Sequence, residues 1–166
     1  MRVSVLIGGK AGQGINKVSK IFSTLLINNG YFVFNYRDYP SLIRGGHNFN
    51  IISFSDEKIG SIESKIDILV ALDELTIEKH KSELKKGGII ISFEKFKDLG
   101  RNLNIALTGA LIKVFGFEKE LFIDTIKNEF GEKSIASAER GFTIYKRIFN
   151  FKRLKNQIRL WNGNQG

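Results

Sequence analysis

The chain of 166 residues has the length of one domain, and a second full domain does not fit in it. With 42% hydrophobic residues, 26% charged residues and a single proline, its composition excludes long disordered tracts. The absence of cysteine excludes disulfides, thiolate-held iron–sulfur clusters and cysteine-based zinc sites. The formal net charge of +9 is compatible with a nucleic-acid partner, but the lysines are spread along the chain, and we favour a compositional bias.

The sequence gives little support to a metal or membrane function. Its two histidines, His47 and His80, stand far apart without a nearby carboxylate pattern, so we predict no metal site. The opening MRVSVLIGG is too short an apolar run for a signal peptide, and no stretch approaches the roughly 20 apolar residues of a membrane helix. We therefore expect a cytoplasmic chain with neither a membrane nor a nucleic-acid partner.

The first part of the chain has the pattern of a β-α-β unit. Residues 3–7 form a short, branched apolar run that ends at a pair of glycines, as a buried strand does before a turn. Apolar residues then recur on one helical face over about 14–28, and Gly30 is placed to end that helix. A second strand over 31–36 completes the opening of a parallel α/β sheet.

The next segment indicates a mixed sheet. Residues 37–48 break every period and contain the only proline, so we expect an ordered, irregular loop. A third strand is predicted over 48–54, and the polar residues after it, followed by the apolar 59–62, indicate a hairpin. Such a hairpin would supply at least one antiparallel pair.

Strands and helices alternate through the middle of the chain. Residues 67–72 are predicted to form a buried strand, and Asp73 after it can cap a helix. That helix is expected to end in the Lys-Lys-Gly-Gly run at 85–88, before a further strand over 89–93.

The C-terminal part is predicted to be helical. Helices are expected over 105–115, 118–130 and roughly 133–149, and a glycine closes each of the first two. The last helix carries an apolar stripe: Ile135, Ala138, Phe142, Tyr145 and Phe149. This stripe could be part of the core or an exposed partner surface, and we favour the core. The predicted fold class is α/β: a three-layer α/β/α domain with a Rossmann-like, mostly parallel but mixed sheet of about five to six strands.

A glycine loop, GGKAGQG at residues 8–14, lies between the first predicted strand and helix. Backbone amides at a helix N-terminus can hold a phosphate, and glycines permit its close approach. The order is GxxGxG instead of the dinucleotide GxGxxG, and the Walker ending is missing, so an independent nucleotide site is not favoured, although Asp38 loosely mimics a ribose-binding acid. A tight turn that lets the helix pack on the sheet explains the glycines equally well.

A second loop, YRDYPSLIRGGHN at residues 36–48, combines aromatic residues, two arginines, a proline and paired glycines. Ligands and partners collect at such strand edges in open α/β sheets. Arg44 can bind a carboxylate or phosphate in bidentate fashion, and the glycines after it let backbone amides approach. The alternative is that Arg37 pairs with Asp38 and the proline only shapes the loop.

The two loops together resemble the gamma subunit or gamma domain of 2-oxoacid:ferredoxin oxidoreductases, which include pyruvate and 2-oxoglutarate synthases. The resemblance covers about residues 1–141 and includes NIALTGALIKVFG from Asn104, which is similar to a helix of that family. It implies a gamma component that supports the thiamine diphosphate-dependent oxidative decarboxylation of a 2-oxoacid to acyl-CoA, with electrons passed to ferredoxin.

The resemblance also implies where function lies. Thiamine diphosphate, Mg, iron–sulfur clusters and coenzyme A belong to the parent complex, and the partners are thiamine-binding alpha and beta subunits or domains and a ferredoxin-type subunit. No catalytic residue is assigned to this chain, so we expect it to be inactive in isolation. The residues expected at an interface near the catalytic cleft, on its coenzyme A side, are Gly9, Gly12, Gln13, Gly14, Arg44, Gly45, Gly46 and Asn48.

The chain end suggests a fused parent protein. Asn162-Gly163-Asn164-Gln165 resembles the start of NGNxAIALGA, which opens the thiamine pyrimidine-binding domain in fused members of the family. We therefore expect a gamma-type domain over 1–149 and a linker over 150–166 that leads toward that domain. The alternative function is a stand-alone nucleotide- or CoA-binding α/β module without catalytic activity. The functional interpretation depends on the two loops lying side by side on one rim of the sheet.

Overall fold

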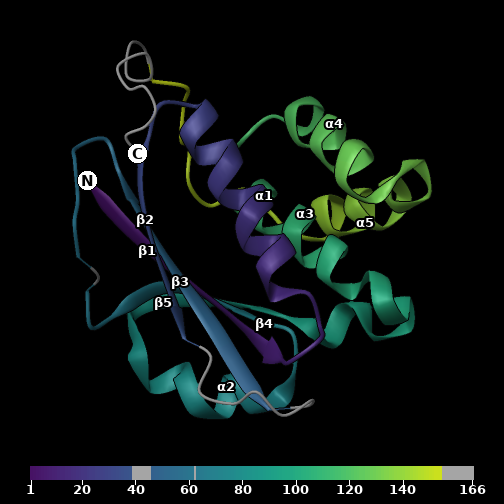
Figure 1. Cartoon of the computed structure of the whole chain (residues 1–166), viewed down its shortest axis with the longest axis horizontal. Helices are drawn as coiled ribbons and strands as arrows, with labels where there is room; N and C mark the ends of the chain where they lie inside the picture. The colour runs from purple at the N-terminus through teal and green to yellow at the C-terminus, as the bar shows by residue number, and fades with distance from the viewer. Residues whose placement is uncertain (39–45, 62, 155–166) are drawn as a thin grey trace.

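In a computed structural model, which describes residues 1–38, 46–61 and 63–154, the chain forms a five-stranded sheet covered by helices (Figure 1). The strands are β1 (Arg2–Lys10), β2 (Phe32–Asp38), β3 (His47–Ser55), β4 (Ile66–Ala71) and β5 (Leu84–Ser92). The α-helices are α1 (Ile15–Asn28), α2 (Glu74–His80), α3 (Leu103–Phe115), α4 (Lys119–Phe130) and α5 (Ile135–Ile144). Short 3-10 helices are η1 (Lys81–Glu83), the kinked η2 (Phe93–Asn102) and η3 (Glu132–Ser134).

The sheet is mixed, with the order β2-β3-β1-β4-β5. β1, β4 and β5 run parallel, whereas β3 lies antiparallel between β1 and β2. The prediction of a mixed α/β sheet is therefore confirmed, and β2 runs parallel to β1 with one strand between them. The predicted hairpin between 48–54 and 59–62 is wrong: β1 and β2 already occupy both edges of β3, and the described residues 56–61 and 63–65 form no strand.

The two faces of the sheet carry helical layers of unequal thickness. Val5 and Ile7 of β1 point into the larger core, which α1 and α3 cover. Leu6, between them, points to the opposite face and joins a smaller cluster with Ile51, Ile66 and Leu69. α2 lies on that second face, where the His80 ring contacts Phe49 with centroids 4.6 Å apart (Figure 1).

α3 is buried on nearly all sides, and α5 crosses it with backbones in contact. A β-carbon on Gly141 would fall on the carbonyl group of Ala106, and one on Gly109 would fall on that of Ala138. Glycine therefore stands in both predicted helices because the crossing leaves no space for a side chain.

The elements predicted with local start and stop signals are found near their expected bounds. Asp73 caps α2 by accepting a hydrogen bond from the amide of Thr76 at 3.0 Å. α3 ends at Gly116 and α4 ends at Gly131, and both glycines have positive φ angles. α1 spans Ile15–Asn28, as its apolar period predicts.

Two predicted helix ends are wrong. The helix after Asp73 was expected to reach 85–88, but those residues belong to β5, in a bulge between the Ile66–Leu84 and Ile68–Ile89 pairs. The last helix ends at Ile144 and not near residue 149, because the chain then turns back across α3.

The segment 145–154 satisfies carbonyl groups at the C-terminal end of α3. The amides of Ile148 and Phe149 donate to Val114 at 2.9 Å, and that of Phe151 donates to Phe115 at 3.0 Å. Four of the five residues of the predicted apolar stripe, Ala138, Phe142, Tyr145 and Phe149, pack in or against the core, as favoured, although the last two lie beyond α5. Residues 155–166 lie outside the described residues, so the linker over 150–166 stays a prediction.

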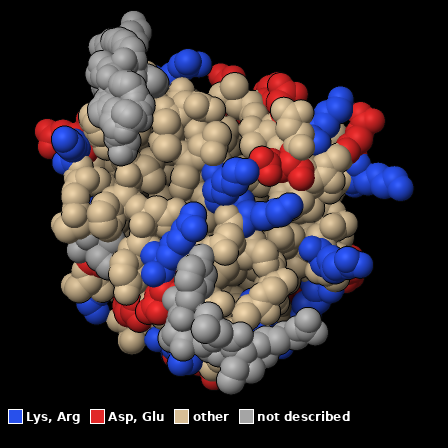
Figure 2. All heavy atoms as spheres, in the orientation of Figure 1, with Lys and Arg blue, Asp and Glu red and all other residues tan. Residues whose placement is uncertain are grey.

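The basic residues do not form one continuous surface in Figure 2, where acidic side chains lie among them. Several of the lysines pair with glutamates: Lys20 with Glu129, Lys119 with Glu139 and Lys127 with Glu132, at 2.9–3.3 Å. Within the described residues, the helices are all too short or too polar to cross a bilayer.

Candidate ligand site at the glycine loop

The glycine loop and the chain that enters β3 lie side by side on one rim of the sheet. β1 and β3 pair up to Lys10 and His47, and just beyond this pair the amide of Ala11 donates to the carbonyl oxygen of Gly46 at 2.7 Å. The glycine loop and the second loop of the sequence analysis therefore meet at Gly46. Arg44 and Gly45 lie outside the described residues.

Gln13 holds the glycine loop closed. Its Oε1 accepts a hydrogen bond from the amide of Lys10 at 2.6 Å, and its Nε2 donates to the carbonyl oxygen of Leu72 at 3.3 Å. The amide of Leu72 in turn donates to the carbonyl oxygen of Gly8 at 2.9 Å. The Gln13 side chain thus ties the end of β1 to the residue that follows β4.

Glycines in the loop serve different purposes. Gly9 is a packing residue, because a β-carbon there would lie 2.6 Å from Gln13 Oε1 and 2.9 Å from Leu72 Cβ. Gly12 and Gly14 have φ angles of +96° and +84°, in the left-handed region that favours glycine. Gly14 also faces Asn104, whose Nδ2 would lie 2.5 Å from an added β-carbon.

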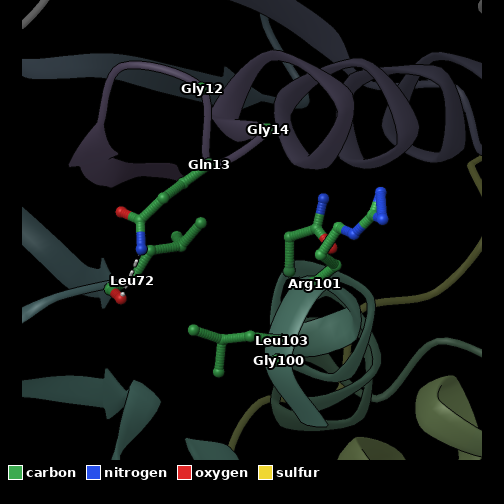
Figure 3. Close-up of a pocket in the computed structure, with 8 residues that line it drawn as sticks. Gly12, Gln13, Gly14, Leu72, Gly100, Arg101 and Leu103 are labelled. Atoms are coloured by element: carbon green, nitrogen blue, oxygen red, sulfur yellow. Dashed lines mark hydrogen bonds between the residues drawn. The ribbon is translucent and has the colours of Figure 1, made fainter. Parts of the chain in front are cut away.

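A cavity of ≈ 450 Å³ opens between this loop and the start of α3 (Figure 3). Gln13 and Leu72 lie on one side of it, and Arg101 projects from the end of η2 on the other. The residues that line it are Gly12, Gln13, Gly14, Leu72, Gly100, Arg101, Leu103 and Asn104.

Two helices begin at the cavity. α1 starts after Gly14 and α3 starts after Asn102, and neither N-terminus is capped by a hydrogen bond from its N-cap side chain. The first turn of a helix carries amide groups without partners inside the helix and a partial positive charge. Both helices therefore bring positive ends to the same space.

The charges and polar groups of the cavity favour an anion. Among the residues that the structure describes, Arg101 is exposed, makes no ion pair, and is the only charged residue that lines the cavity. Asn104 is 8% exposed, and its unpartnered Oδ1 is an acceptor, so this atom suits a donor group of a ligand and not the phosphate itself. A phosphate would meet amide donors and a guanidinium here, and no carboxylate stands among the described residues of the lining.

Sequence reasoning found one wall of this cavity and missed the other. Gly12, Gln13 and Gly14 line it, whereas Gly9 lies behind the loop opposite Asn48, its register partner on β3. Asn48 is buried with an unpartnered Oδ1, on the sheet face that α1 covers. Of the residues that sequence reasoning missed, only Asn104 stood in a motif that the sequence analysis names. The missed residues come from three other segments: Leu72, Gly100, Arg101, Leu103 and Asn104.

A family model and curated relatives of this chain both belong to ferredoxin-linked oxidoreductases. The model of the pyruvate ferredoxin/flavodoxin oxidoreductase family matches residues 4–100. A 2-oxoacid:ferredoxin oxidoreductase subunit alpha from a Sulfolobus species is 39% identical over 85 residues, which cover 51% of this chain. The match spans only 13% of that relative's length.

Solved structures share the fold. A gamma subunit of a keto/oxoacid ferredoxin oxidoreductase from Geobacter sulfurreducens superposes with a TM-score of 0.70 at 22% identity, covering 86% of this chain and 95% of that one. A 2-oxoglutarate:ferredoxin oxidoreductase from Magnetococcus marinus, with 2-oxoglutarate, coenzyme A and succinyl-CoA bound, has a TM-score of 0.76 at 17% identity. That match covers 93% of this chain and 34% of the other.

Proposed function

Because this chain belongs to the pyruvate ferredoxin/flavodoxin oxidoreductase family, we propose that it is the gamma component of a 2-oxoacid:ferredoxin oxidoreductase and that its glycine-loop cavity binds a phosphate group of coenzyme A. The parent reaction decarboxylates a 2-oxoacid oxidatively, transfers the acyl group to coenzyme A and passes electrons to ferredoxin. The partners are the thiamine-binding subunits or domains and a ferredoxin-type subunit.

One observation carries this proposal: α1 and α3 both begin at a cavity where Arg101 is the only charged lining residue within the described parts of the chain. Helix N-termini and guanidinium groups are the groups with which proteins bind phosphate. The volume of ≈ 450 Å³ falls in the range of small-molecule sites, about 300–1,000 Å³, and suits part of a coenzyme A molecule.

The residues of this chain bind and orient; they do not react. Iron–sulfur clusters need thiolates, and these 166 residues contain no cysteine, so they cannot hold the clusters of the parent complex. Thiamine diphosphate supplies the carbanion chemistry there. Arg101 and the loop amides hold the phosphate end of coenzyme A, which orients its thiol toward the partner that carries the acyl group.

The experiment uses the assembled complex and the variant Arg101→Gln. Loss of a charge-assisted hydrogen bond to phosphate should raise KM for coenzyme A about tenfold and leave kcat nearly unchanged. Arg153→Gln is the matched control, because Arg153 is exposed and its neighbour Leu154 bonds to Asn29 at the end of α1 opposite the cavity. An equal KM in both variants would overturn the assignment of the cavity to coenzyme A.

A further inference from the structure

We propose that His47, His80 and Glu83 form a proton-sensitive latch that fastens α2 to the first residue of β3, and through it sets the rim of the glycine loop. His47 lies next to Gly46, whose carbonyl oxygen receives the Ala11 amide. The latch thus lies one residue away from the contact between the two loops, on the sheet face opposite α1.

The three side chains form a continuous hydrogen-bonded chain. The Nε2 atoms of His47 and His80 lie 2.8 Å apart, and His80 Nδ1 lies 2.9 Å from Glu83 Oε2. Both histidines are buried, at 8% and 5% exposure, while the carboxylate of Glu83 reaches solvent. The chain therefore connects a buried imidazole to the surface.

The contacts assign the tautomers. A carboxylate accepts only, so Nδ1 of His80 carries a hydrogen and donates to Glu83. In neutral His80 the Nε2 is then an acceptor, and the donor must be Nε2–H of His47. Nδ1 of His47 is consequently a buried acceptor, and it has no hydrogen-bond partner.

The hydrogen bond between His47 and His80 can persist when one proton is added to the two rings, but not when two are added. With one imidazolium, one Nε2 still donates and the other accepts. With both rings protonated, both Nε2 atoms are donors and two positive charges face each other across 2.8 Å, so the contact must open. Burial, and next the charge of His80, lower the pKa of His47, which keeps the latch closed at neutral pH.

The other charged groups around His47 act on its pKa in opposite directions. Asp38 at the end of β2 and Asp73 before α2 favour its charged form, whereas Lys79 on α2 opposes it. Lys10, its cross-strand partner, is exposed. Gly8 leaves room for α2 beside the latch, because a β-carbon there would lie 2.7 Å from Thr76 Cγ2, whereas His47 Cε1 would be in ordinary contact at 3.4 Å.

The test is an NMR titration of the full chain with labelled histidine, from about pH 8 to about pH 5. The chain has two histidines, so every imidazole signal belongs to the pair. We expect an Nδ1–H tautomer for His80, an Nε2–H tautomer for His47 and a pKa of His47 below the ordinary histidine value of 6.5. An Nδ1–H tautomer of His47, or a pKa of His47 that is not lowered, would overturn the proposal.

Hydrogen exchange tests the link to the rim. Protection of the Ala11 amide, relative to the buried Leu111 amide in α3, should fall severalfold as the second proton binds. His80→Gln should abolish this pH dependence. Should that variant not fold, Glu83→Gln keeps both imidazoles and should raise the population of the other His80 tautomer; an unchanged tautomer ratio would contradict the latch.

Discussion

The side-chain amide of Asn104 occupies the space that a side chain on Gly14 would need, with 2.5 Å between Nδ2 and the position of an added β-carbon. Two segments far apart in the sequence, the loop before α1 and the first turn of α3, are thereby fitted together at the candidate site. The absence of a side chain at residue 14 is a property of the site and not only of the turn.

Gly14→Ala should therefore lower the stability of the chain by more than backbone strain alone would. An alanine at φ +84° loses about 1–2 kcal/mol of stability, and the clash with Asn104 adds to that loss. Gly12→Ala is the matched control, because its φ is +96° and no atom lies within 4 Å of an added β-carbon. Urea unfolding of both variants should show the larger loss for Gly14→Ala, and equal losses would contradict the contact with Asn104.

Gly141→Ala should destabilise the chain although alanine favours helices. In an exposed helix this change gains about 1 kcal/mol, but here the new methyl group would meet the carbonyl group of Ala106. Overpacking at such a site costs about 1–3 kcal/mol, so the expected net change is a loss. Thr143→Ala, at an exposed position of the same helix, controls for helix propensity in thermal unfolding. A Gly141→Ala variant with a raised Tm would show that α3 and α5 can separate freely.

The free energy of unfolding should fall as the pH drops below about 6.5. Because the pKa of His47 is lowered in the folded chain, the unfolded chain binds more protons in this window, and stability is lost as pH falls from the unfolded pKa through the folded one. Urea unfolding at about pH 7.5, 6.5 and 5.5 measures this. The loss should shrink in His47→Asn, and an identical pH slope in that variant would assign the effect to other groups.

The sequence predicted features that depend on local chemistry. Gly116 and Gly131 closed helices where expected, and Asp73 capped one, because a cap involves residues within one turn. The hairpin failed because strand pairing is not local: β3 had β1 and β2 as partners.

The same limit applies to the candidate site. The glycine loop was visible as a motif, but Arg101 follows an irregular polar segment and carries no pattern of its own. Only the packing of α3 against α1 brings it to the loop. Residue spacing along the chain cannot reveal such a pairing, whereas the order of the parallel strands β1 and β4 could have placed Leu72 there.

Replacement of Gln13 separates loop closure from direct ligand binding. Gln13→Glu keeps an acceptor for the Lys10 amide but sets a carboxylate against the carbonyl oxygen of Leu72, where Nε2 now donates. The lost bond and the repulsion should cost about 1–3 kcal/mol. The new negative charge should also weaken phosphate and coenzyme A binding at the cavity.

Gln13→Met, of similar length, removes both hydrogen bonds without adding charge. Calorimetric titration with coenzyme A, together with urea unfolding, distinguishes the two contributions. A loss of affinity in both variants would mean that the closed loop itself presents the phosphate-binding amides, since both disturb its closure. A loss confined to Gln13→Glu would mean that charge alone controls the site. Unchanged affinity in both would place the phosphate elsewhere, because no anion could sit beside the carboxylate that Gln13→Glu introduces into this cavity without a cost in free energy.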